Sequence, residues 1–577
     1  MKIKIIFAVL AVLAVAFGMS QGPATTETSS YIVQGQSMAA VVEAVQSVDG
    51  DVTHELGIIK AVGASLTASQ RAALLANPAI TAINTDAPVT NSGGVAGGSP
   101  GAYAEFPALV GADDLHANGI TGRSVTVAIL DSGMAAIAEL NKDTTGVDRS
   151  LKRYNSITDQ EGTHLDKYGH GTHVASIILN TDYADDGTMR RNSIAPDVRV
   201  TPVKAFDQYG NGTYANVIRG LDWIYTHKDQ YNIRVLNLSF NAPARSHYWD
   251  DPINQAVMQL WQAGVVVVAS AGNDGPEAMT IGVPGNNPYV ITVGAMSDNY
   301  TPADGSDDRL ATFSSAGPTV EGFVKPEVVA PGGHMTARSR AKSRIAKEHP
   351  EFHDYDKYFT MSGTSQAAAV VSGIAALVLD ANPGMSNDDV KCRIISSARP
   401  AVNINDELAY SIFQQGAGMI DAQAAVYGSA SGCANRGLDI NLDITGQRHY
   451  GGPANMDADG NFYIMGLEGY LWTDSGPGAN GYLWTNGYLW TDGGPNTNGY
   501  LWTNGYLWTD GSVGTNGYLW TDGTVGANGY LWTNGYLWTD GGVNANGYLW
   551  TDVGNNGYLW TDLLTESASV NHWVDQE

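Results

Sequence analysis

The chain has 577 residues, 43% of them hydrophobic, which is enough for a large buried core and for three or four domains of about 100–200 residues each. Its 58 acidic and 31 basic residues give a formal net charge of −27. This charge argues against nucleic acid or an anionic membrane as the main partner, because both select basic surfaces.

The N-terminus has the layout of a secretory signal peptide over residues 1–20. Two lysines precede an apolar run from Ile5 to Phe17, and small residues follow it. An anchor helix is the weaker alternative, because the run is shorter than the ~20 residues that span a membrane. No later stretch reaches that length by inspection. We therefore expect a secreted, extracellular protein whose mature form has no membrane span.

Residues 24–90 are expected to form a small α/β domain. Strand-like runs lie at 31–33, 58–62 and 80–83, and residues 38–48 have the apolar spacing of a helix. Thr67 and Gln70 form the capping box of a second helix. Residues 91–104 follow as a linker rich in Gly and Ser, a composition typical of exposed chain that proteases cut.

Residues 105–428 alternate apolar runs with helical patterns. The runs are continuous rather than alternating, which indicates strands buried on both faces of a parallel sheet covered by helices. We therefore predict an α/β domain here. The expected strands are Val125–Leu130, Val198–Phe206, Val235–Phe240, Val265–Ser270 and Val290–Met296.

The last part of the chain is a repeat. Tyr-Leu-Trp-Thr occurs ten times within residues 469–562, mostly in steps of six or twelve, and such a fixed period marks a repeat structure. We expect a stack of β-hairpins or a β-solenoid, or else a mostly disordered chain. The aromatic residues either stack on one another or bind a polysaccharide or another surface. Residues 429–468 are expected to be a linker or small β segment, and 563–577 a C-terminal tail.

Three short segments carry groups that complement one another chemically. Asp131 ends an apolar strand, His170 lies between glycines before a helical stretch, and Ser365 opens a long apolar helix. Taken singly, each residue has an ordinary structural explanation. Asp131 could be a turn residue, His170 a structural histidine, and Ser365 a helix cap. Together they supply a nucleophile, a base to take its proton, and a carboxylate to orient the base. The N–H groups at the start of the Ser365 helix also suit a developing oxyanion.

A metal is not expected at the histidines. His173 follows His170 by three residues, but the His-Glu-x-x-His pattern of zinc peptidases is absent. The chain has two cysteines, Cys392 and Cys433, and a single pair in a secreted protein predicts a disulfide.

The three segments resemble the signature blocks of the subtilase family, peptidase S8, and the resemblance extends over residues 105–428. It implies a subtilisin-like parallel sheet covered by helices. It also implies a serine endopeptidase that hydrolyses proteins or peptides through an acyl-enzyme, with Asp131, His170 and Ser365 as the triad and no cofactor required for catalysis. The rival interpretation is a surface-binding or adhesion protein with an inactive protease-like domain.

Further blocks of the family fit the regions that would bind substrate. Asn273 stands where the family has its oxyanion donor. The segment Ser239, Phe240 and Asn241 resembles the strand that pairs with substrate and walls the first specificity pocket, and Gly212 resembles the opposite wall. The family often has Gly where Asn241 stands, so this chain departs from the pattern in its pocket.

Residues 24–90 resemble the family's inhibitor I9 propeptide, with an accessory domain as the alternative. The resemblance implies a zymogen that its own propeptide inhibits until it is cut in or near residues 91–104. Family members often bind structural calcium, and the acidic loops 182–186 and 304–308 are candidates. Since no EF-hand-like spacing is present, we interpret them as solvated loops and assign no metal ligands.

Overall fold

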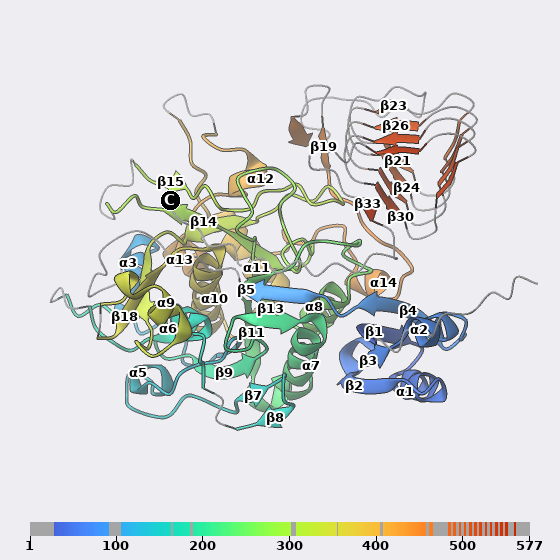
Figure 1. The fold of residues 1–577 in the computed structure, drawn as a ribbon. Helices are drawn as coiled ribbons and strands as arrows, with labels where there is room; N and C mark the ends of the chain where they lie inside the picture. The colour runs from blue at the N-terminus through green and yellow to red at the C-terminus, as the bar shows by residue number, and fades with distance from the viewer. Residues whose placement is uncertain are drawn as a thin grey trace, which may run out of the picture. The chain divides into compact units, whose positions relative to one another are not determined.

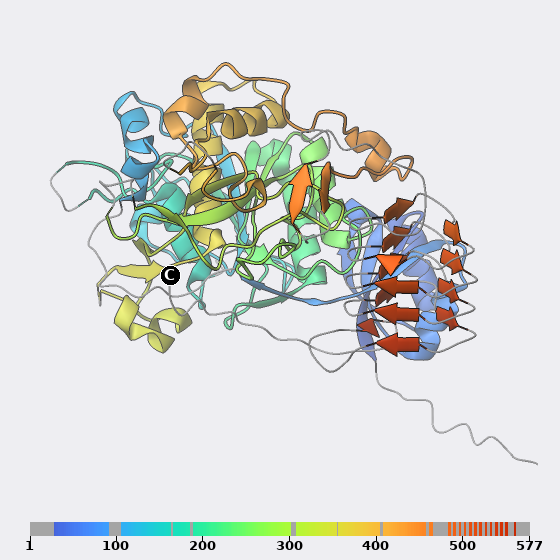
Figure 2. The same ribbon diagram turned by 90° about the horizontal axis from the view of Figure 1, so that it is seen from above.

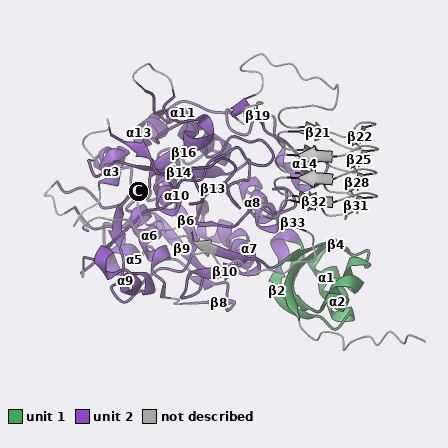
Figure 3. Cartoon of the chain, turned by 45° about the horizontal axis from the view of Figure 1, so that its top comes forward, with its two compact units in different colours: residues 1–55, 60–85 green, residues 56–59, 86–577 purple. Residues whose placement is uncertain are grey.

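The computed structural model describes residues 28–91, 105–162, 165–184, 188–301, 307–354, 356–403, 408–456 and 461–464, and the backbone of short strands between 483 and 560. The expected signal peptide, most of the 91–104 linker and the tail 563–577 lie outside the described residues. Figure 3 shows the two compact units, residues 1–55 with 60–85, and residues 56–59 with 86–577.

The first unit is a four-stranded sheet with two helices. In the strand order β2-β3-β1-β4, the central β1 pairs antiparallel with β3 and β4. Val33, Val41 and Leu66 belong to its buried core. The elements are β1 (Ser29–Gly35), α1 (Met38–Ser47), β2 (Asp51–Leu56), β3 (Ala61–Leu66), α2 (Ala68–Leu75) and β4 (Ile80–Thr85).

Most of the predicted elements of this unit are present, with one difference. The capping box forms, with the Thr67 hydroxyl accepting from the Gln70 backbone and the Gln70 side chain accepting from the Thr67 backbone. The strand expected at 58–62 instead begins at Ala61, after a 3₁₀ turn over Gly57–Ile59. β2 was not predicted, because its alternation of exposed and half-buried residues is mostly polar and carries a weak apolar signal.

The second unit contains the predicted α/β sheet, with nine strands. It runs β15-β14-β13-β11-β6-β9-β7-β8, with β16 paired to β14 (Figure 1). All pairs are parallel except the edge pairs β14–β15 and β7–β8. Every residue of β6, β13, β14 and β16 is buried, as the continuous apolar runs predict. The strands are β6 (Thr126–Asp131), β7 (Tyr154–Asn155), β8 (Gln160–Glu161), β9 (Arg199–Lys204), β11 (Ile233–Leu238), β13 (Val266–Ser270), β14 (Ile291–Ser297), β15 (Arg309–Leu310) and β16 (Val328–Pro331).

Two pairs of helices pack on this sheet. α6 (His170–Leu179) contacts α10 (Thr364–Ala381), and α10 also packs against β11, β13, β14 and β16. α7 (Tyr214–Tyr231) and α8 (Pro252–Gln262) pack against each other, and α7 also contacts β6 and β11. Among the described residues, α10 is long and apolar enough to cross a membrane by length and composition. However, 89% of it is buried inside the protein, so it is a core helix.

The segment after residue 428 is partly packed. The structure joins Cys392 of α11 (Asn387–Ser397) to Cys433 through a disulfide. β19 (Ala454–Met456) and β20 (Phe462–Ile464) pair antiparallel, so this segment is more than a linker. A short helix that the sequence did not predict, α14 (Ile440–Ile444), buries Asp443, whose carboxylate accepts hydrogen bonds from Tyr248 and Tyr289.

The repeat region forms three ladders of parallel strands (Figure 2). Leu483 pairs with Leu501, and Leu501 with Leu519, so one turn takes 18 residues and three six-residue steps. Parallel pairing is that of a solenoid and rules out the stack of antiparallel hairpins. The ladders are β21 (Leu483–Thr485), β24 (Leu501–Thr503), β27 (Leu519–Thr521), β30 (Leu537–Thr539) and β33 (Leu559–Trp560); then β22 (Leu489–Thr491), β25 (Leu507–Thr509), β28 (Val525–Ala527) and β31 (Val543–Ala545); then β23 (Asn496–Thr497), β26 (Val513–Thr515), β29 (Leu531–Thr533) and β32 (Leu549–Thr551).

Candidate active site

Asp131 and His170 meet where a strand ends and a helix begins. Asp131 is the last residue of β6, and His170 is the first of α6. Both are buried, and Nδ1 of His170 lies 2.9 Å from each carboxylate oxygen of Asp131. Because a carboxylate only accepts, Nδ1 carries a proton, and the neutral form of the ring has its lone pair on Nε2. Nε2 is buried without a hydrogen-bond partner among the described residues.

Gly171 lets α6 begin this close to β6. A Cβ atom at this position would collide with the carbonyl oxygen of Gly133 and would lie 3.0 Å from Oδ1 of Asp131. Any larger residue would therefore push the helix, and with it His170, away from the carboxylate. This close approach explains why a glycine directly follows the histidine.

Ser365 lies in the first turn of α10 and is fully buried. Its hydroxyl donates to the carbonyl oxygen of Ser239 at 3.2 Å, and the Ser239 hydroxyl donates to the Ser365 carbonyl at 3.0 Å. The structure records no hydrogen bond between Ser365 Oγ and His170 Nε2. A rotation about the Cα–Cβ bond moves Oγ away from Ser239, and in free enzymes catalytic hydrogen bonds are often formed only when substrate binds.

Asn273 is oriented by the residue that precedes Ser365. Its Oδ1 accepts hydrogen bonds from the backbone N–H of Thr364 at 3.0 Å and from the Thr364 hydroxyl at 2.9 Å. Because these hydrogen bonds occupy the amide oxygen, Nδ2 is the atom of the amide that can donate to another group. Nδ2 is buried and has no partner among the described residues. A donor held in this way suits a charge that appears only during a reaction.

His173, in the same helix as His170, is a structural histidine with its own hydrogen bonds. Its Nε2 lies 2.9 Å from the carbonyl oxygen of Phe359 and 3.1 Å from that of Met335, so Nε2 carries the proton. Its Nδ1 lies 3.5 Å from Nε2 of Gln366, the residue after Ser365. Burial lowers the pKa of His173 to about 3, so the ring is neutral at working pH. This histidine therefore links the helix of His170 to the start of the helix of Ser365.

The two predicted walls of the substrate cleft lie on either side of one strand. β5 (Pro88–Asn91) pairs antiparallel with β10 (Asn211–Thr213) and with β12 (Phe240–Asn241). Gly212 is opposite Val89, and Asn241 is opposite Thr90. The structure thus brings together the two segments that the sequence assigned to substrate binding, with a strand of the chain itself between them.

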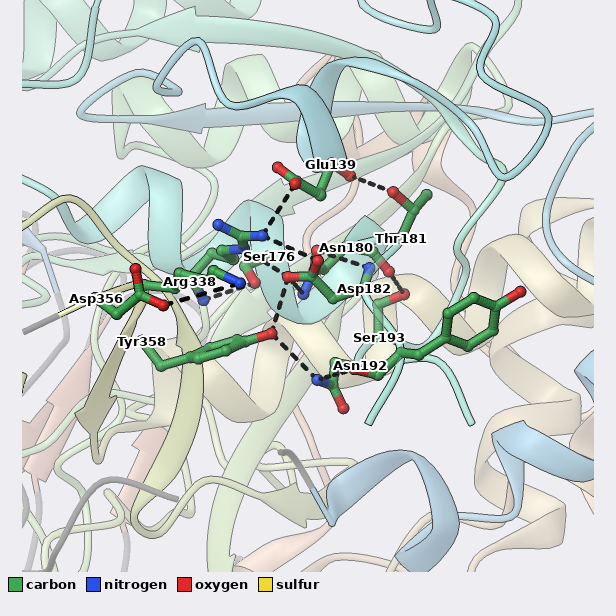
Figure 4. Close-up of polar contacts among 12 residues, drawn as sticks. Glu139, Ser176, Asn180, Thr181, Asp182, Asn192, Ser193, Arg338, Asp356 and Tyr358 are labelled. Carbon is green, nitrogen blue, oxygen red and sulfur yellow. Dashed lines mark hydrogen bonds and ion pairs between the residues drawn. The ribbon is translucent and has the colours of Figure 1, made fainter. Parts of the chain in front are cut away.

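The described acidic loop residues do not fit a calcium ion. Asp182 accepts two hydrogen bonds from Arg338, at 2.5 and 2.9 Å, and one from Tyr358 at 2.8 Å (Figure 4). Burial raises the pKa of Asp182, but the hydrogen bond and charge of Arg338 outweigh it, so its pKa is lowered. The guanidinium supplies the positive charge that a cation would bring. Among the described residues no group of three His, Cys, Asp or Glu is arranged for a metal.

The second candidate loop is only partly described. Residues 185–187 and 302–306 lie outside the described residues, as do the side chains of the repeat region. Asp307 accepts hydrogen bonds from Thr301 and Asn299, as expected for a hydrogen-bonded loop. For the undescribed parts of these loops, the interpretation as solvated loops without assigned metal ligands stays a prediction. For the repeats, stacked aromatics and binding of a polysaccharide or another surface stay the two alternatives.

A buried Asp–His pair at a strand end, a serine at a helix start and a parallel sheet between helices define the class of serine proteases with a subtilisin-like fold. The sequence model of the Subtilase family matches residues 122–419, about half of the chain. The chain belongs to the subtilase family and is a serine-type endopeptidase.

Individual relatives agree with this assignment. The serine protease AprX of Bacillus subtilis is 35% identical over 54% of this chain and 67% of its own length. Subtilisin DY of Bacillus licheniformis is 32% identical over 55% of this chain and 96% of its own. Among solved structures, fervidolysin from Fervidobacterium pennivorans, a keratinolytic enzyme related to subtilisin, has a TM-score of 0.55 at 22% identity. That match covers 75% of this chain and 64% of the fervidolysin chain, and it supports the fold alone.

Proposed function

We propose that this chain is a secreted serine endopeptidase made as a self-inhibited precursor, with Asp131, His170 and Ser365 as its catalytic triad. The observation that carries the triad is the buried pair of Asp131 and His170, which leaves the lone pair of Nε2 without a partner among the described residues. A neutral imidazole held in this tautomer is the general base that a serine hydroxyl needs.

In the proposed reaction, Ser365 Oγ attacks the carbonyl carbon of a peptide bond while His170 Nε2 takes its proton. Asp131 keeps the ring in the correct tautomer and stabilises the imidazolium. The imidazolium then returns the proton to the leaving amine, which gives an acyl-enzyme. Water, deprotonated by His170 in turn, releases the acid and restores the serine.

Asn273 is the proposed oxyanion donor, together with the backbone N–H of Ser365. The tetrahedral intermediate carries a negative charge on the former carbonyl oxygen, which a donor already fixed in place stabilises without reorganisation. The two hydrogen bonds from Thr364 to Oδ1 support this role, because they fix which end of the amide is available.

The position of β5 supports the proposal of a precursor that blocks its own substrate site. The strand fills the space between Gly212 on β10 and Asn241 on β12, where an extended substrate would pair by backbone hydrogen bonds. Residues 24–90, which end in this strand, would therefore exclude other substrates until the chain is cut after it.

The test is the variant Ser365→Ala. The native chain should react with a fluorophosphonate at Ser365 and should convert to a shorter form, whereas Ser365→Ala should remain unlabelled and full length when expressed alone. An unlabelled native protein would favour the rival interpretation, an inactive protease-like domain that serves binding. Normal shortening of the variant in a host without secreted proteases would contradict self-processing.

A further inference from the structure

Three chain segments lie close together beside Ser365. The first runs from Ser239 to β12, and its Ser239 carbonyl accepts a hydrogen bond from Ser365. The second follows β13, whose Ser270 donates to the carbonyl of Phe240 at 3.1 Å. The third contains Val283, which pairs with Ala242 through backbone hydrogen bonds. These contacts hold the three segments in fixed positions.

The side chain of Asn241 lies between the other two segments. A Cβ atom at Gly272 would lie 2.8 Å from Nδ2 of Asn241, and one at Gly282 would collide with Oδ1. The amide therefore lies against the backbone of both glycines, which belong to those two segments. A glycine at position 241 would leave that space open.

The amide has a fixed orientation and one unused polar atom. Nδ2 donates to Oδ2 of Asp274 at 3.2 Å, and since a carboxylate cannot donate, the nitrogen must be on that side. Oδ1 faces the other way, is buried, and has no hydrogen-bond partner among the described residues. A buried acceptor without a donor is costly, so a group that supplies a donor there is favoured.

We propose that Asn241 determines specificity by restricting the residue before the cleaved bond to a small side chain and by favouring one with a hydroxyl group. This inference rests on the proposed peptidase function. Side chains two apart on a strand share a face, so Ser239 and Asn241 point to one side, as does the substrate residue opposite each of them. The substrate residue opposite Ser239 would therefore lie beside the attacking oxygen, with its side chain directed toward the space that the Asn241 amide occupies.

The chain's own sequence is consistent with this restriction. Asn91, the last described residue of β5, pairs with Phe240. Ser92 lies outside the described residues, but in the sequence it is a small hydroxyl residue followed by Gly93 and Gly94. If the enzyme cuts its own chain after this small hydroxyl residue, the mature chain begins at Gly93.

The experiment uses four peptide anilides that differ only in the residue before the scissile bond: Ser, Ala, Phe or Lys. For the native enzyme, kcat/KM should be about fivefold higher for the Ser substrate than for the Ala substrate, because the Ser hydroxyl adds one hydrogen bond. The Ala substrate should in turn have a kcat/KM at least ~10-fold higher than the Phe or Lys substrate. Asn241→Gly should raise the Phe-to-Ala ratio by ~10-fold or more. Asn241→Leu keeps the volume and removes the acceptor, so Phe should stay excluded while the Ser-to-Ala ratio falls toward one.

The Ala substrate serves as the folding control for both variants. Faster cleavage after Phe or Lys than after Ser by the native enzyme, or an unchanged Phe-to-Ala ratio in Asn241→Gly, would overturn the inference while leaving the peptidase function intact. No cleavage of any substrate by a native chain that also fails to react with a fluorophosphonate would instead refute the proposed function. Mass spectrometry of the processed native chain should give an N-terminus at Gly93, and a start that follows a large or charged residue would contradict the inferred restriction.

Discussion

Two acidic groups in the same unit, the buried Asp131 and the half-buried Asp182, have opposite surroundings. Asp131 pairs with His170 in a site where two buried nitrogens, Nε2 of His170 and Nδ2 of Asn273, have no partner among the described residues. Asp182, in contrast, pairs with Arg338 in a cluster where Tyr358 and Asn192 complete the hydrogen bonds. Unsatisfied buried polar atoms cost free energy, so a fold keeps them where a ligand or transition state will use them. The surroundings of the first cluster thus support the proposed reaction, whereas those of the second stabilise the fold.

The largest effect should follow from removing an unused donor. Asn273→Leu keeps the approximate size of the side chain and deletes Nδ2, so kcat should fall roughly 10²–10³-fold with little change in KM. The reason is that the donor contributes mainly once the oxyanion forms. The measurement is steady-state kinetics on a peptide anilide that the native enzyme cleaves.

A matched control comes from the other cluster. Asn192→Leu deletes an amide whose Nδ2 is already used, donating to Tyr358 at 3.3 Å. It should lower the free energy of unfolding by about 1–3 kcal/mol and leave kcat unchanged. If both variants lost kcat to the same extent, the distinction between the two clusters would not hold.

The sequence pointed to the residues of the first cluster but not to those of the second, for a physical reason. Asp131 ends β6, and His170 and Ser365 lie in the first turns of their helices. Asn273 follows the end of β13 by three residues. Local sequence patterns mark such places. Arg338 and Asp182 are far apart in the sequence, and only the folded chain shows that they meet. The two carbonyl partners of His173 were unpredictable for the same reason.

The repeats show the same limit at the level of the fold. The six-residue period predicts the length of each strand-and-turn step, but both antiparallel hairpins and a parallel solenoid satisfy it. The parallel pairing of Leu483 with Leu501, 18 residues further along the chain, shows that the repeats form the solenoid. This pairing depends on how the chain bends at each corner between strands. That bend is not encoded in the period itself.

The next largest effect concerns the stabilising cluster. Arg338→Met should leave the half-buried Asp182 without its main counter-charge and lower the free energy of unfolding by about 2–3 kcal/mol. Arg344→Met is the matched control, because its ion pair with Glu348 is exposed and should contribute less than about 1 kcal/mol. Both are measured by urea unfolding in a Ser365→Ala background, which prevents self-digestion. Equal losses would show that burial gives the Arg338 pair no advantage.

The last prediction is a change of stability with pH, small for each pH unit, and it tests whether His173 belongs to the stabilising surroundings of the site. Burial holds the pKa of His173 at about 3, below its ordinary value of 6.5. Between these two values the unfolded chain binds a proton that the native chain does not, so stability rises with pH across this window and falls as pH drops from 6.5 toward 3. The contribution is at most about 1.4 kcal/mol per pH unit.

The variant His173→Gln keeps an N–H donor for the carbonyls of Phe359 and Met335 but cannot titrate. Its free energy of unfolding, measured in the Ser365→Ala background, should therefore fall less steeply between pH 6.5 and pH 4. If the free energy of unfolding of this variant and that of the Ser365→Ala protein fell equally with pH over this range, His173 would not be held neutral by burial.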